Sequence, residues 1–198
     1  MKVEQFVMAY KIDQDRIRAL LPEGFQSLRP VLRINAEIRE EEIYIEFNTP
    51  AAAFGKKGWL NIANWKSSET KIACVRENKK TTFITSFLEI TFIGVGIEGN
   101  CPAEADNDGC FFIDSSNKIE LVLPEKIFSR KEFCDCIFKW KFTENDAHGI
   151  SIGEKTLPAI PTEPVNNYEK QKLTAETAAH IPCEQILGQY TVVFERGN

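Results

Sequence analysis

Short stretches in which apolar and polar residues alternate occur along most of this chain, and this alternation restricts the fold more than any other feature. Side chains of a β-strand point in turn to opposite faces of a sheet, so a period of two predicts strands with one apolar face. In the segment 31–39, Leu32, Ile34, Ala36 and Ile38 share such a face. We predict strands at residues 5–10, 31–39, 43–48, 59–65, 71–77, 81–95, 111–114, 119–123, 137–142 and 190–195.

Helical signals are few and short. Asp13 is a suitable N-cap for a helix at 13–21, and Ile12 and Ile17 are spaced as a hydrophobic staple around it. A capping-box pattern at Ser129 predicts another helix start. The remaining predictions are helical turns at 175–180 and 183–187 and an extended, proline-containing loop at 157–164.

The connections between the predicted strands are short, and closely connected neighbours pair antiparallel because parallel pairs need long crossovers. The chain has 198 residues, of which 43% are hydrophobic, enough for one well-filled core. We therefore predict a mainly β (α+β) fold, a curled antiparallel sheet or cone-like β-barrel with a few short helices. Residues 1–198 are expected to form a single domain.

Charge and composition exclude several classes of function. The net charge is -5, so the basic footprint of a nucleic-acid-binding protein is missing. No apolar run is long enough for a membrane helix, and no secretory signal is recognisable, which favours a cytoplasmic protein whose six cysteines stay reduced. Neither a metal site nor a cofactor motif is predicted. The 14 Phe, 4 Tyr and 3 Trp are suited to a broad core or to the lining of a small-molecule pocket.

Polar residues on the second face of two predicted strands are the first candidates for a site. The strand at 31–39 carries Arg33 and Glu37 on this face, and the next strand carries Tyr44 and Glu46. If the face meets water, these residues form an ordinary solvated surface. If the sheet curls so that the face is internal, they line a charged pocket in which Arg33 pairs with a carboxylate. The sequence leaves both interpretations open.

A pair of lysines next to aromatic residues is the second candidate. Lys56 and Lys57 lie between Phe54 and Trp59, which are placed to exclude water. A desolvated amine beside another cation is more readily neutral, and a neutral amine attacks a carbonyl to form a Schiff base. A basic hairpin turn is the alternative. Glu89, within an apolar strand, either faces water or sits in a pocket where it handles protons.

The segment from Tyr10 to Phe25 contains Tyr-Lys-Ile-Asp and then Ile-Arg-Ala-Leu-Leu-Pro-Glu-Gly-Phe, and it resembles the acetoacetate decarboxylase-like superfamily. In that family a strand and a short helix with a leucine-x-proline-glutamate end precede the first barrel strands. Residues 43–48, Thr49-Pro50 and Gly55-Lys56-Lys57 look like a shortened version of the family's strand, loop and lysine segment. The match covers about residues 5–60. The family's lysine follows a Gly-x-Pro motif, whereas here Gly55 directly precedes Lys56.

The resemblance implies a cone-like barrel with a central pocket and, for true decarboxylases, a lysine that forms a Schiff base with a β-keto acid. We therefore expect a small keto acid or carbonyl compound as the ligand. The catalytic candidates are Lys56, Lys57, Glu46 and Glu89, and the substrate-binding candidates are Arg33, Tyr44, Phe54 and Trp59. The alternatives are a barrel that binds a small molecule without catalysis, and a module that forms homo-oligomers through exposed strands.

Overall fold

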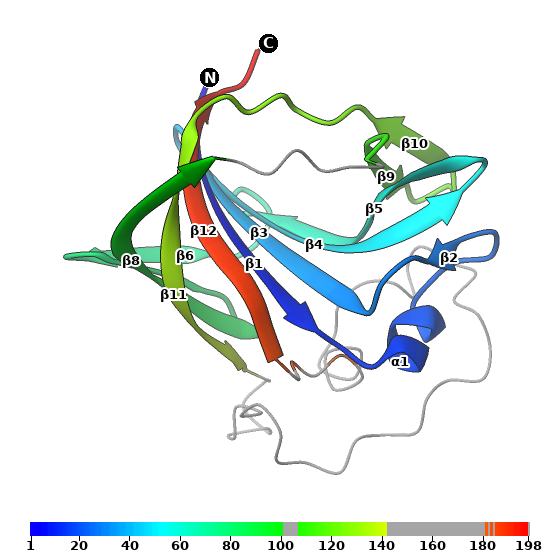
Figure 1. Ribbon diagram of the computed structural model, residues 1–198, viewed down its shortest axis with the longest axis horizontal. Coiled ribbons are helices and arrows are strands. Elements are labelled where there is room, and N and C mark those ends of the chain that lie inside the picture. The colour runs from blue at the N-terminus through cyan, green and yellow to red at the C-terminus, as the bar shows by residue number, and fades with distance from the viewer. Residues whose placement is uncertain (101–106, 142–180, 182, 184, 198) are drawn as a thin grey trace.

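Twelve strands and one short helix are present in the computed structural model, which describes residues 1–100, 107–141, 181, 183 and 185–197 (Figure 1). The elements are β1 (Lys2–Lys11), α1 (Gln14–Ala19), β2 (Gln26–Ser27), β3 (Val31–Arg39), β4 (Glu42–Ala53), β5 (Lys56–Lys66), β6 (Ala73–Glu77), β7 (Lys80–Ile84), β8 (Leu88–Asn100), β9 (Cys110–Ile113), β10 (Ile119–Val122), β11 (Arg130–Trp140) and β12 (Gln185–Glu195).

All of these strands belong to one strongly curled sheet (Figure 1). Its order is β10-β9-β5-β4-β3-β1-β12-β11-β8-β7-β6, with β2 attached to β4. Neighbouring strands pair antiparallel, apart from the parallel pair of β5 and β9. The prediction of a mainly β, curled antiparallel sheet is confirmed. Among the described strands, β10 and β6 are the two edge strands of this sheet, and they do not pair with each other. The sheet is therefore curled but not closed into the cone-like barrel that the sequence offered as an alternative.

Helix α1 forms where its capping signals predict it. The Asp13 carboxylate accepts hydrogen bonds from the backbone N–H groups of Asp15 and Arg16, both at 3.0 Å. Ile12 and Ile17 are fully buried, as a hydrophobic staple requires. No helix among the described residues has the length and apolar character needed to cross a membrane.

The two faces of the central strands have different surroundings. On one face Phe6 of β1 meets Phe83 of β7, with ring centroids 5.1 Å apart. Apolar residues of β3, β4, β8 and β11 join them in the largest hydrophobic cluster, which includes Met8, Tyr10, Leu32, Ile34, Ile45, Phe47, Ile90 and Phe138. The opposite face carries Arg33, Asn35 and Glu37 of β3, and it is the face on which the pockets lie.

The predicted strand at 81–95 is interrupted in the structure. Backbone Phe87 and Leu88 donate to the Thr85 hydroxyl at 3.1 and 2.9 Å, and the Thr85 N–H donates to the Leu88 carbonyl at 2.9 Å. This turn separates β7 from β8, so the prediction of one continuous strand over residues 81–95 is wrong. The bend expected near Gly94 or Gly96 is present: Gly96 has φ +73° and the β8–β11 register shifts there.

Two helical predictions are also wrong. Arg130, next to the predicted helix start at Ser129, begins β11, where pairing to β8 and β12 overrides the local capping pattern. Residues 185–187 of the predicted turn at 183–187 belong to β12. The predictions for 157–164 and 175–180 lie outside the described residues.

A connecting segment crosses the polar face of the sheet. Residues 123–129, which we call the strap, run from β10 to β11 (Figure 1). Ile127 of the strap packs on a small cluster of Val3, Val192 and Phe194. The strap therefore covers part of the polar face from the side opposite the hydrophobic core.

Close packing of β5 on the start of β9 gives a first test of the fold. A Cβ added at Gly58 would overlap the carbonyl oxygen of Gly109, and the backbone of Trp59 donates to this same oxygen at 3.0 Å. We expect Gly58→Ala to lower the free energy of unfolding by about 1–3 kcal/mol in urea denaturation. Gly188→Ala is the control, because no atom lies within 4 Å of its added Cβ. Equal losses in both variants would contradict this packing.

Candidate functional site

Two adjoining pockets lie on the polar face of the sheet. The first has a volume of about 1070 Å³ and the second about 780 Å³. Arg33, Trp59, Asn107 and Tyr190 line both, so the two pockets are parts of one trough. We call the first the cationic pocket; its other lining residues include Leu28, Arg29, Lys57, Lys131, Phe133 and Leu187. We call the second the network pocket; its other lining residues include Gln5, Asn35, Glu37, Arg39, Tyr44, Glu46, Cys110, Glu125 and Arg196.

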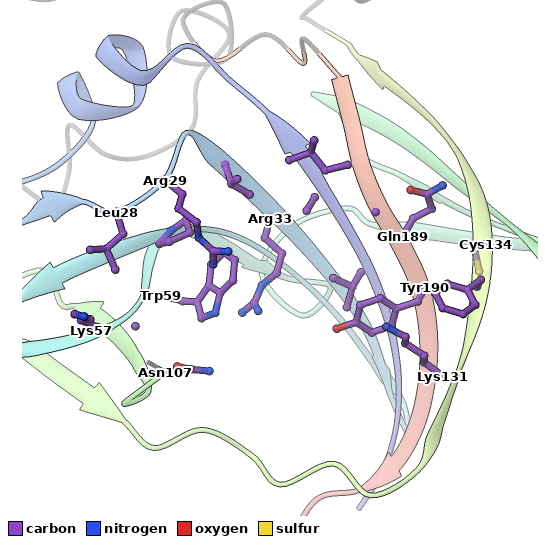
Figure 2. Close-up of a pocket in the computed structure, with 18 residues that line it drawn as sticks. Leu28, Arg29, Arg33, Lys57, Trp59, Asn107, Lys131, Cys134, Gln189 and Tyr190 are labelled. Atoms are coloured by element: carbon purple, nitrogen blue, oxygen red, sulfur yellow. The ribbon is translucent and has the colours of Figure 1, made fainter. Parts of the chain in front are cut away.

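The cationic pocket takes its name from four basic side chains. Arg29, Arg33 and Lys57 come from the region of β3 and β5, and Lys131 comes from β11 (Figure 2). The described lining contains no aspartate or glutamate. A lining of this composition favours an anionic ligand over a neutral or cationic one.

Arg33 is held against the ring of Trp59 at the centre of the trough. The guanidinium carbon Cζ of Arg33 lies 3.7 Å from the ring centroid, and that of Arg29 lies 6.0 Å from it. Trp59 is only 8% exposed, so its position is fixed by packing. Stacking of this kind orients a guanidinium and leaves its N–H donors in the plane of the group.

Lys131 lies on the other wall, among aromatic rings. Its Nζ is 4.9 Å from the ring centroid of Tyr190 and 5.0 Å from that of Phe133. Figure 2 shows Lys131 and Tyr190 facing Arg33 and Trp59 across the pocket. The cationic pocket therefore has basic groups on both walls.

Glu46 is the centre of a buried network in the other half of the trough. Its carboxylate accepts hydrogen bonds from Asn35 Nδ2 at 2.7 Å, from the Tyr44 hydroxyl at 2.9 Å and from Asn61 Nδ2 at 3.3 Å. Burial raises the pKa of the Tyr44 hydroxyl, and the neighbouring Glu46 carboxylate raises it further. Tyr44 therefore stays a protonated donor and holds Glu46 in place.

Glu37 forms a second buried group with two arginines. Arg196 Nη1 and Nη2 donate to its two carboxylate oxygens at 3.0 Å each, and Arg39 Nε donates at 2.6 Å. Burial would raise the pKa of Glu37, but the hydrogen bonds and positive charge of Arg196 and Arg39 outweigh it and lower the pKa. Arg196 also binds Glu125, so it links the strap to the floor of the trough.

Comparison with known proteins identifies the fold. No protein-family model and no curated protein matches the sequence. Among solved structures, the chain is similar to acetoacetate decarboxylase from Legionella pneumophila, with a TM-score of 0.61 and 11% identity over 98% of this chain and 81% of that one. The enduracididine biosynthesis enzyme MppR complexed with pyruvate gives a TM-score of 0.53 and 10% identity over 97% and 84%. An acetoacetate decarboxylase-like enzyme from Sphingomonas wittichii RW1 gives 0.53 and 9% over 97% and 87%.

The chain has the acetoacetate decarboxylase-like fold. The resemblance seen in the first third of the sequence thus extends to the architecture of most of the chain. Within this fold, the structure brings together four of the candidate residues from the sequence: Arg33, Tyr44, Glu46 and Trp59 all line the network pocket. Of the two interpretations of the polar face, the internal one holds, since Glu37 and Glu46 are buried.

The other four candidates are arranged differently within the acetoacetate decarboxylase-like fold. Lys57 is exposed but lines the cationic pocket, on the same face of β5 as Trp59. Lys56 is also exposed and lines neither pocket. Phe54, 71% exposed at the turn before β5, contacts the ring of Phe25. Glu89 of β8 pairs with a lysine outside both pockets, Lys141, at 3.0 Å.

Several residues of the trough were missed by reasoning from sequence. They are Arg29, Lys131, Tyr190 and Arg196. Tyr190 lies in the strand predicted at 190–195, whereas Lys131 lies in the segment predicted as a helix start, and nothing in the sequence shows that their strands lie side by side. Among the described residues no three histidine, cysteine, aspartate or glutamate side chains are grouped as a metal site.

The contact of Arg196 with Glu37 predicts a stability that depends on pH. Glu37 has a lowered pKa in the folded chain, so its contribution is present above its unfolded pKa and is lost as pH falls through the folded value. We expect Arg196→Gln to lower the free energy of unfolding by about 2 kcal/mol at pH 7, with a smaller loss at about pH 3. Arg130→Gln, which removes an exposed pair with Glu98, is the control and should cost under about 1 kcal/mol. A loss in Arg196→Gln that does not change with pH would contradict this role of Glu37.

Proposed function

We propose that the chain binds a small keto acid or related carbonyl compound in the cationic pocket, with Arg33 holding the ligand's carboxylate. The observation that carries the proposal is the position of Arg33, which lies where the two pockets join. Its guanidinium is oriented by the ring of Trp59, whose centroid lies 3.7 Å from Cζ. A guanidinium presented edge-on suits a carboxylate, because two parallel N–H groups match its two oxygens. The pyruvate complex of MppR, which has the same fold, supports this class of ligand.

The trough also offers groups for the rest of such a ligand. Lys57 and Lys131 are amines on the pocket walls, and Asn107 adds an amide where the pockets join. Tyr190 provides an apolar ring surface for a carbon skeleton. A keto acid bound at Arg33 would thus place its carbonyl within a pocket that contains two amines.

Titration with pyruvate and with acetoacetate tests the binding proposal. We expect Arg33→Gln to weaken binding at least about tenfold, since a charge-assisted hydrogen bond to the carboxylate is lost. Calorimetric titration of both compounds measures the change. Arg18→Gln is the matched control, because Arg18 lies 62% exposed on α1, outside both pockets, and pairs with its near neighbour Asp15. Absence of binding to the unaltered chain, or equal affinity in Arg33→Gln, would overturn the proposal.

We further propose a second candidate function, Schiff-base catalysis by Lys57. Lys57 and Trp59 are two residues apart on β5 and share the pocket face, whereas Lys56 points to the other face. The amine of Lys57 would add to the ligand carbonyl, and the adduct would lose water to form a protonated imine. When a β-keto acid bound in this way loses carbon dioxide, the imine takes up the electron pair of the broken carbon–carbon bond. Glu46, in the adjoining pocket, is our choice over Glu89 for returning a proton.

Reductive trapping tests this chemistry. Borohydride added in the presence of acetoacetate is expected to fix an adduct on Lys57, located by mass spectrometry of its peptide. Lys57→Arg should abolish the adduct, and Lys56→Arg, the matched control on the neighbouring residue, should retain it. An adduct on Lys131 would overturn the assignment to Lys57. No adduct at any lysine, with binding retained, would mean that the pocket binds its ligand without this catalysis.

A further inference from the structure

The cationic pocket is large for a compound of three or four carbons. Its volume is about 1070 Å³. Pockets that enclose drug-sized ligands span roughly 300–1,000 Å³, so this pocket lies just above that range. A keto acid of the size of pyruvate, held at Arg33, would leave most of the pocket unfilled.

Among the described residues, three exposed apolar side chains line this pocket. Leu28 is 41% exposed, Phe133 40% and Leu187 50%. Side chains of this size are favourably removed from water, and their grouping in a concave site marks it for an apolar partner. The pocket therefore offers an apolar surface in addition to its basic groups.

The basic and apolar groups are distributed unevenly between the two walls. Arg29, Arg33 and Lys57 lie on the wall near β3 and β5 (Figure 2). Phe133 and Leu187 belong to β11 and β12 on the other wall, where Lys131 is the one basic group of the described lining. Leu28 lies beside Arg29 on the first wall. A ligand with a carboxylate at one end and a hydrocarbon body extending from it matches this distribution.

We infer that the ligand of the cationic pocket is an amphiphilic carboxylate, an acid whose chain or aromatic body reaches from Arg33 to the wall formed by β11 and β12. The inference rests on the proposed function, because it assigns the carboxylate to Arg33, and it narrows the ligand class within it. The single charged group is anchored by the arginine beside Trp59. The hydrocarbon body covers Phe133 and Leu187 and displaces water from them.

A series of 2-oxo acids of increasing length tests the inference. Calorimetric titration from pyruvate to the ten-carbon acid, kept below micelle-forming concentration, should show affinity rising about fourfold with each methylene that is buried. Decanol, which lacks the carboxylate, should bind at least tenfold more weakly than the ten-carbon acid. An affinity that is flat along the series, or equal binding of decanol, would overturn the inference.

Two substitutions locate the hydrocarbon body. Phe133→Ala should raise the ratio of the dissociation constant of the ten-carbon acid to that of pyruvate by about tenfold, since it removes apolar surface from the β11 wall. Ile137→Ala is the matched control on the same strand, because Ile137 is 51% exposed and lies outside the pocket. An unchanged ratio in Phe133→Ala would overturn the placement of the chain.

The results of these titrations distinguish the amphiphilic ligand class from the proposed binding of a small keto acid. If pyruvate binds through Arg33 but longer acids bind no better, the proposed function stands and the amphiphilic ligand class is wrong. If long acids bind through Arg33 and pyruvate does not, the amphiphilic class stands and the small keto acid is wrong. If no acid in the series binds, both are wrong.

Discussion

Two carboxylates buried on one face of the sheet are the constraint on which the trough depends. Glu37 and Glu46 lie under the curl of β3 and β4, where an unpaired charge would be severely destabilising. Glu46 is satisfied locally, by Asn35, Tyr44 and Asn61. Glu37 is paired with Arg39 on its own strand and with Arg196 from the far end of the chain. The polar interior is therefore completed only when β12 has paired with β1 and brought Arg196 over β3.

Alternation in the sequence could predict β3 and β4 but not the environment of their polar face. A strand with a solvated face and a strand lining a polar interior show the same period of two. The distinction lies in the pairing of charges across strands. The sequence shows Glu37 and Arg39 as near neighbours, but it gives no sign that Arg196 lies beside them, 159 positions away from Glu37.

The mispredicted elements share a physical cause. In each, a preference read from the local sequence is overridden by contacts made in the folded chain. Ser129 and Glu132 have the spacing of a capping box, yet the carboxylate of Glu132 instead accepts from the backbone of Gly96 at 3.0 Å, across the irregular pairing of β8 and β11. Residues 81–95 are mostly β-branched or aromatic, so propensity alone favours one strand. Thr85 ends it because its hydroxyl accepts two backbone N–H groups and stabilises a turn.

The basic groups of the cationic pocket show why the spacing of residues in the sequence predicts only a small part of the site. Lys57 and Lys131 are far apart in the chain, and only the order β5-β4-β3-β1-β12-β11 brings their strands around one trough. Curvature over these six strands sets how far Lys131 lies from Arg33. The same curvature is held by Arg196, which joins the strap and β3 at the other end of the trough. The contacts of Arg196 that complete the polar interior thus also help to fix the distance between the two pocket walls, which a ligand must span.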